Sequence, residues 1–412
     1  MNDQAYGDDN NHEPGYSTID ENISSSATAF HEPQDVHRLV QMFQGVVDDM
    51  PSDFDSLMQN KPDWIDPEKL KRGQQFALEH YFGVSFSKIL SLYILFALSH
   101  NGLDTLIYTR MSDTPYKAYR RYYATSDIIK SWMETDILTP ETKGNKNMRR
   151  VFQMHQKVHE DLLQNPIIDG QMEPRCTILG KPWYTATLAN LKKDFKCISP
   201  APTEINSLLE RQKTVFNQCY LTTTQFGFFG LAIVYPEWFG IHDYSRQDME
   251  DFVHLWRTIG YLMGIKDEYN FGRGTLDEVK ERSKWLIRVL VIPKFREITE
   301  KWEHMSRCAA EGVRMYMKKS LSFESSFCYL CDILGLKSTN VKKTIGFRKY
   351  IYLWWLRFFM KYLLKWNLFN LRKRLNRYIF KSMKTAAEEL NNENIQIKLL
   401  NKFIKYEQTA AV

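Results

Sequence analysis

Several motifs that carry common chemistries are missing from this 412-residue sequence. It contains no glycine-rich phosphate loop, no Walker pattern and no nucleophile elbow, which argues against nucleotide-dependent and serine-esterase chemistry. Cysteine is scarce and scattered, and the only close pair, Cys328 and Cys331, lacks the second pair that a structural zinc site needs. We therefore expect buried, free thiols in a reducing compartment. The six cysteines are Cys176, Cys197, Cys219, Cys308, Cys328 and Cys331.

Two segments of the chain lack charge of one sign, although the net charge is only +6. Residues 1–35 contain eight acidic residues and no Lys or Arg, which predicts a disordered acidic tail. This tail has neither a basic region nor an apolar run, so it is not expected to be a secretory signal. By contrast, residues 342–384 contain 13 Lys or Arg and no Asp or Glu.

Long hydrophobic runs are also missing. The strongest, Ile89 to Leu98, ends after ten residues at a Ser-His-Asn-Gly segment. It is too short to cross a bilayer and predicts a buried core helix. The content of 43% hydrophobic and 14% aromatic residues is enough for a sizeable core. So many rings are consistent with an apolar pocket, with membrane contact or with an aromatic core.

Helix signals recur along the chain and predict an all-α protein. Asp66-Pro67, Asp113-Thr114-Pro115, Ser245 and Thr275 to Glu278 are typical helix starts. The helix after Pro115 is expected to run to about Trp132. The helix after Ser245 is expected to carry Gly260 and Gly264. These two glycines are typical either of close helix packing or of a helix end. The expected parts are a tail at 1–35, a linker with weak helix at 36–64, a single helical bundle at 65–335, and a basic aromatic helical region at 340–405. Residues 165–202 read as irregular, with a short hairpin or a lid, and residues 203–229 as one long or two short helices.

A histidine stands out on one helix face between residues 148 and 162. His155 is the only ionisable residue on that apolar stripe, and His159 lies one turn further, at its edge. Such a position suits a ligand to a buried metal or haem, whereas the ordinary alternative is a core histidine with a protein partner. The stripe consists of Met148, Val151, Phe152, His155, Val158 and Leu162.

Four blocks along residues 65–300 resemble, in order, the family of the ER-bound oxygenase mpaB and the rubber oxygenase (latex-clearing protein). They are Arg72 to Phe76, Tyr119 to Thr125, Thr224 to Phe229 and Trp256 to Ile265. The resemblance implies a large all-helical domain around a buried haem b and apolar pocket. It makes His155 the iron ligand, with Arg121 and Thr125 as the Arg-x-x-x-Thr element beside the haem.

By the same resemblance, Arg121 and Thr125 are the candidate catalytic residues, dioxygen is the co-substrate, and the substrate is an apolar, isoprenoid or other lipid alkene. The ordinary alternatives are an arginine that ties helices together and a threonine bonded to its own backbone. The rubber-cleaving members carry a lysine where this chain has Ala124, and only Asp104 stands near the position of their carboxylate. These departures favour a second hypothesis, a catalytically inactive member that serves as a membrane-associated lipid-binding or interaction protein.

The basic region at 342–384 also carries many aromatic residues. We expect Arg357, Lys361 and Lys365 on one face, as in a cationic helix lying in a membrane interface. Alternatives are a core helix with outward basic side chains, and nucleic-acid binding, which the many apolar residues disfavour. Together these features predict an intracellular protein, at the cytoplasmic face of the endoplasmic reticulum or of another membrane.

Overall fold

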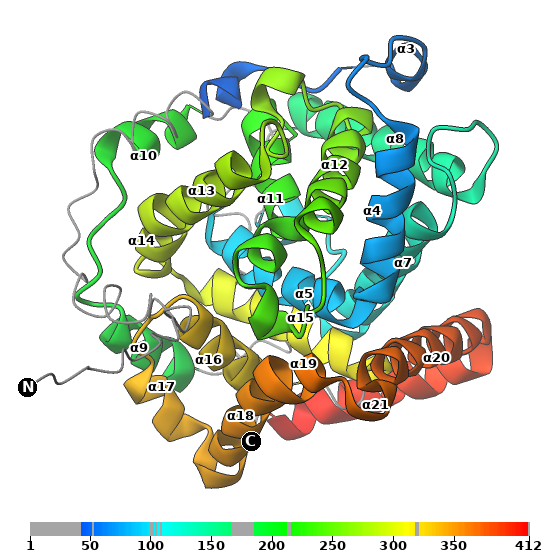
Figure 1. Ribbon diagram of the computed structural model, residues 1–412. Coiled ribbons are helices and arrows are strands. Elements are labelled where there is room, and N and C mark those ends of the chain that lie inside the picture. The colour runs from blue at the N-terminus through cyan, green and yellow to red at the C-terminus, as the bar shows by residue number, and fades with distance from the viewer. Residues whose placement is uncertain are drawn as a thin grey trace, which may run out of the picture.

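The computed structural model describes residues 43–51, 53–98, 103, 105–107, 109–165, 185–211, 216–317 and 321–410. Within these ranges every regular element is a helix, and a single isolated bridge joins Asp49 and Asn217. The predicted all-α class is therefore confirmed for the described part of the chain (Figure 1). The predicted tail at 1–35 lies outside the described residues.

The helices that build the body of the molecule follow one another in short steps. In chain order they are η1 (Gln44–Val47), α3 (Phe54–Gln59), α4 (Pro67–Glu79), α5 (Tyr81–Leu98), α7 (Pro115–Glu134), α8 (Lys143–Gln164), α9 (Thr185–Asp194), α10 (Thr203–Glu210), α11 (Gln218–Val234), η3 (Pro236–Phe239), α12 (Arg246–Leu262), η4 (Asp267–Tyr269), α13 (Leu276–Leu286), η5 (Ile287–Val291), α14 (Ile292–Phe295) and α15 (Glu300–Tyr316). The C-terminal region contains α16 (Phe323–Ile333), α17 (Thr339–Thr344), α18 (Gly346–Phe358), η6 (Phe359–Leu363), α19 (Leu364–Trp366), η7 (Leu368–Asn370), α20 (Leu371–Asn391) and α21 (Glu393–Ala410).

The helix starts are where the sequence places them, because side chains satisfy the first free N–H groups. The Asp66 carboxylate accepts hydrogen bonds from the backbone N–H groups of Glu68 and Lys69. Thr114 caps α7 in the same way, and Ser245 and Thr275 form complete capping boxes at α12 and α13. As predicted, α7 runs past Trp132, to Glu134.

Small residues let the central helices approach closely, since a side chain at these points would collide with a neighbour. A Cβ on Gly73 of α4 would lie 2.2 Å from the carbonyl oxygen of Asp251 on α12. A Cβ on Gly260 would meet the Gln225 amide of α11 at the same distance, whereas Gly264 ends α12 with a φ of 90°. The two interpretations of these glycines are therefore both correct, one for each residue.

Helix α5 is the apolar centre of the bundle and packs on α11 and α15. It spans 18 residues, so the predicted ten-residue run is only its second half. By length and composition α5 is the one helix in the described residues that could cross a membrane, but 61% of it is buried inside the protein. The predicted core position is therefore confirmed, while the argument from a short length was wrong.

Two stretches are more ordered than the sequence suggested. Within 165–202, residues 185–194 form α9, whereas residues 166–184 and any hairpin or lid there lie outside the described residues. Of the two arrangements expected for residues 203–229, the described part shows two helices, α10 and α11, and α11 continues to Val234. Phe43, Met50 and Phe54, from the expected linker, are buried in the core. As expected, Cys219, Cys308, Cys328 and Cys331 are buried and form no disulfide within the described residues. Cys197 is exposed, and Cys176 lies outside the described residues.

The basic aromatic region folds back onto the bundle, and this corrects the cationic face expected at residues 357, 361 and 365. Arg357 pairs with Asp332, and the Lys361 Nζ lies 3.4 Å from a Glu237 carboxylate oxygen and 3.8 Å from the centre of the Trp238 ring. Two of the three predicted membrane-facing cations therefore pair with acidic residues of the protein, and they fasten α18 to α16 and η6 to η3. Only Lys365 is exposed.

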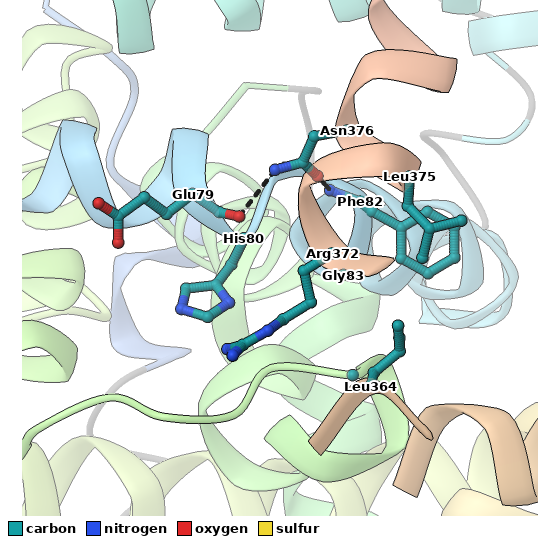
Figure 2. A pocket seen from close by; sticks show the side chains of 9 residues that line it. Glu79, His80, Phe82, Gly83, Leu364, Arg372, Leu375 and Asn376 are labelled. Carbon is teal, nitrogen blue, oxygen red and sulfur yellow. Dashed lines mark hydrogen bonds between the residues drawn. The ribbon is translucent and has the colours of Figure 1, made fainter. Parts of the chain in front are cut away.

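Helix α20 is held at the junction of α4 and α5 by one side chain. The Asn376 amide donates to the carbonyl oxygens of Leu78 (3.0 Å) and Glu79 (2.7 Å), and its oxygen accepts from the Phe82 N–H at 2.9 Å. Figure 2 shows Asn376 reaching across to Glu79 and Phe82. The cavity beside Asn376 measures about 10 Å³, which is room for about one water molecule. We therefore interpret this place as a packing contact between helices.

Candidate functional site

The two helices that carry the predicted site residues pack against each other. Helix α7 supplies Arg121 and Thr125, one turn apart, and α8 supplies His155. Both helices begin at a capping threonine, Thr114 and Thr142 respectively, which fixes where their side chains point along the bundle.

The His155 imidazole is partly buried and has an unused nitrogen. Its Nδ1 atom is shielded from solvent and has no hydrogen-bond partner among the described residues. The ring stacks on the Phe216 ring, with centroids 4.5 Å apart and planes tilted by 24°. Burial, and secondly the positive charge of Arg121, lower the pKa of His155 to about 4. The imidazole is therefore neutral at pH 7, the form that can donate a lone pair to a metal.

Arg121 brings a positive charge to the same place. Its Nη1 donates to the Ser112 hydroxyl at 3.0 Å, and Ser112, which is fully buried, precedes the same helix. This bond is local to α7, so it does not tie Arg121 to another helix. Among the residues that the structure describes, Arg121 forms no ion pair with a carboxylate. A partly buried guanidinium with uncompensated charge is suited to an anionic or strongly polarised ligand.

Two residues that the sequence did not single out complete the cluster. Tyr220 lies in the first turn of α11, and its ring contacts Phe216 edge-on at 5.4 Å. Burial raises the pKa of the Tyr220 hydroxyl, and the Arg121 charge acts against that rise. Phe216 adopts a left-handed backbone, with a φ of 71°, which is rare for a bulky residue and often marks a functional position. His155, Arg121, Phe216 and Tyr220 therefore form one aromatic and electrostatic unit.

The other predicted site residues are less well connected. Thr125 is partly buried, and no hydrogen bond or ion pair joins it to Arg121 or His155 in the described part of the chain. Ala124 is exposed, and Asp104 lies outside the described residues. His159 is buried on α8, with its Nε2 atom 3.8 Å from a carboxylate oxygen of Asp49. The described residues contain no group of three His, Cys, Asp or Glu side chains that could hold a metal ion.

The remaining blocks of the resemblance have packing roles. Arg72 on α4 pairs with Asp251 on α12 at 2.6 Å, and Gln74 donates to backbone carbonyl oxygens at the end of α7. Gln225 on α11 donates to the Trp256 carbonyl oxygen and accepts from the Phe271 N–H. Three of the four blocks therefore fix how α4, α7, α11 and α12 pack, and the block with Arg121 contributes to the cluster itself.

No protein-family model, curated protein or solved structure matches this chain. The family resemblance thus stays a prediction from the four sequence blocks.

The buried histidines make the stability of the protein depend on pH. Burial lowers the pKa values of both His80 and His155 to about 4, from 6.5 in an unfolded chain. The unfolded state therefore binds protons first as the pH falls, so this contribution to stability is complete above pH 6.5 and is lost between about 6.5 and 4. We expect the free energy of unfolding, measured by urea titration, to fall from pH 7 to pH 5 by at most ~1.4 kcal/mol per pH unit for each histidine. His80→Gln with His155→Gln should weaken this dependence, and an unchanged slope would contradict the assignment.

Proposed function

We propose that this protein binds one haem b through His155 and acts as an oxygenase-like oxidoreductase on an apolar alkene such as an isoprenoid lipid, with dioxygen as co-substrate. The observation that supports this most is the neutral His155 imidazole, whose Nδ1 atom has no hydrogen-bond partner among the described residues, together with the Arg121 guanidinium, which forms no ion pair there. Three other histidines, the buried His242 and His304 and the half-buried His254, each bond a backbone carbonyl oxygen through a ring nitrogen. No bond of this kind holds the Nδ1 atom of His155 among the described residues.

The residues of the cluster fit the proposed group. His155 would supply the iron ligand, and the stacked Phe216 ring would hold the imidazole plane. The Arg121 guanidinium would compensate a haem carboxylate, since its charge has no carboxylate partner among the described residues. Haem, when bound, supplies a redox-active iron that activates dioxygen. Tyr220 and Phe216 would limit water at the site, and the Tyr220 hydroxyl, whose pKa burial raises, would stay protonated and able to donate.

The test is the visible absorption spectrum of the full chain, expressed with a haem supply and purified. We expect a Soret band that corresponds to about one haem per chain. Unfolded controls must lose the band, which separates site binding from nonspecific adsorption. A folded, colourless protein would overturn the proposal.

The second candidate is a non-catalytic, membrane-associated protein that uses an apolar pocket or surface to bind lipid. The observation that favours it is Ala124 on α7, because its methyl group offers no atom that could cap an iron. This candidate predicts that lipid binding survives His155→Ala unchanged. The haem proposal predicts that the same substitution removes the cofactor.

A further inference from the structure

The exposed apolar surface of this protein is concentrated in one short segment. Ten of the sixteen large hydrophobic side chains that are exposed in the described part of the chain lie between residues 347 and 369. Phe369, at 78%, and Phe347, at 77%, are the most exposed of all. We call this surface the aromatic ridge: Phe347, Tyr350, Ile351, Tyr352, Trp354, Trp355, Tyr362, Trp366, Leu368 and Phe369. A concentration of this kind marks a surface with a partner.

The aromatic ridge has a fixed place in the fold, because the inner face of its helices packs on the rest of the protein. Leu353, Met360 and Leu364 are buried against the body, and the ion pairs of Arg357 and Lys361 hold the same face. On the outer face the rings touch one another: Phe358 lies 5.5 Å from Tyr362 and 6.4 Å from Trp366, between ring centroids. The helix ends in a sharp turn, with left-handed φ values at Asn367, Phe369 and Asn370, and this turn carries Leu368 and Phe369 at its tip.

Positive charge surrounds the ridge and continues along α20. Of the 13 Lys and Arg residues between 342 and 384, four make ion pairs, two with Asp332 on α16 and the others with Glu237 and Asp243. The other nine are exposed and form no ion pair within the described residues. They are Lys343, Arg348, Lys349, Lys365, Lys373, Arg374, Arg377, Lys381 and Lys384. Figure 1 shows α18, α19 and α20 following one another along the lower edge of the molecule.

From this surface we infer that the aromatic ridge and the exposed cations of α20 dock the protein onto an anionic lipid bilayer, with the rings at the depth of the headgroups. Trp and Tyr favour that depth because their rings are apolar and their polar atoms stay hydrated. The cations match anionic headgroups. A second copy of the chain fits less well, since a two-fold contact would bring the same unpaired positive charges together. This inference does not depend on haem binding.

The test is co-sedimentation of the full chain with phosphatidylcholine vesicles, with and without phosphatidylserine, at low and high salt. We expect strong binding only with phosphatidylserine, weakened by salt. Changing Trp354, Trp366 and Phe369 together to Ser should abolish it. Ile397→Ser with Leu400→Ser, two exposed apolar residues on α21, is the matched control and should bind like the unmodified chain.

Charge is tested separately with Arg374, Arg377 and Lys381 changed to Gln, against the control Lys71, Lys157 and Lys337 changed to Gln, all exposed. The first set should weaken binding about fivefold for each charge removed, and the control should change it little. Quenching of tryptophan fluorescence by bromine-labelled lipid gives a second readout that needs no variant. The inference is overturned if the ridge variant binds as well as its control, if quenching is absent, or if an oligonucleotide displaces the chain from the vesicles.

Discussion

Replacing His155 with alanine is expected to abolish haem retention while the protein stays folded. The side chain is partly buried on α8 and is not one of the large, fully buried side chains of the core, so we expect the core to stay intact when it is removed. It removes the one neutral imidazole of the cluster with an unused ring nitrogen. The measurement is the Soret absorbance per chain after purification with a haem supply, together with the circular dichroism of the same sample.

The matched control is His159→Ala, one turn further along α8. His159 is also a buried histidine, but its Nε2 faces Asp49 at 3.8 Å and it is not stacked on Phe216 in the described structure. This variant should keep its haem. Equal loss in both variants would point to a general disturbance of α8, and full haem in His155→Ala would make His155 a core residue. Either outcome contradicts the assignment of the ligand.

The secondary structure was readable from the sequence because it depends on local signals. Asp66, Thr114, Ser245 and Thr275 each act within three residues of themselves, so a cap can be recognised without the fold. The apolar stripe that carries His155 is equally local. These signals predicted the start of α7 and the all-α class.

The composition of the candidate site was only partly readable. The expectation that Arg121 and His155 belong to one site came from the resemblance, and the Arg121 charge is the second cause, after burial, of the lowered pKa of His155. The stacking of Phe216 on His155 joins residues 61 positions apart, across segments whose packing depends on the whole bundle. A signal did exist, since Asn217 is a good cap and marks the start of α11, but it says nothing of where the preceding ring points.

The error about the cationic face has a related cause. Helical spacing correctly puts Arg357 and Lys361 on one side, but spacing alone does not tell which side faces the solvent. The partners Asp332 and Glu237 come from α16 and η3, and each supplies the carboxylate that turns a cation inward. The sequence pattern therefore identified the region that exposes aromatic side chains and cations, but it assigned Arg357 and Lys361 to the wrong face.

A large loss of stability is expected when Arg307 is changed to methionine. Arg307 on α15 is buried, and it bonds Glu303 at 2.8 Å, Glu324 on α16 at 2.5 Å and the Thr187 hydroxyl on α9 at 3.0 Å. Removing one partner of a buried ion network leaves the remaining charges without compensation, which costs about 3–5 kcal/mol. The measurement is the urea midpoint at pH 7.5, with the slope of the transition as a check on two-state unfolding.

Arg314→Met is the control on the same helix. Arg314 also pairs with a glutamate, Glu311, at 2.9 Å, but its side chain is 38% exposed, so its loss should cost about 0–1 kcal/mol.

The cost of the Arg307→Met substitution should also shrink at lower pH. Burial already raises the pKa of Glu303, and Arg307 helps to hold the pKa of Glu324 below its usual value against burial. Without Arg307, the carboxyl groups of Glu303 and Glu324 are easier to protonate, and protonation removes their uncompensated charge. The folded variant then binds more protons than the unfolded chain. Its free energy of unfolding therefore rises relative to that at higher pH as the pH falls. Equal effects of the two substitutions, or a cost at Arg307 that is the same at pH 5.5 and 7.5, would show that the buried network does not hold α9, α15 and α16 together.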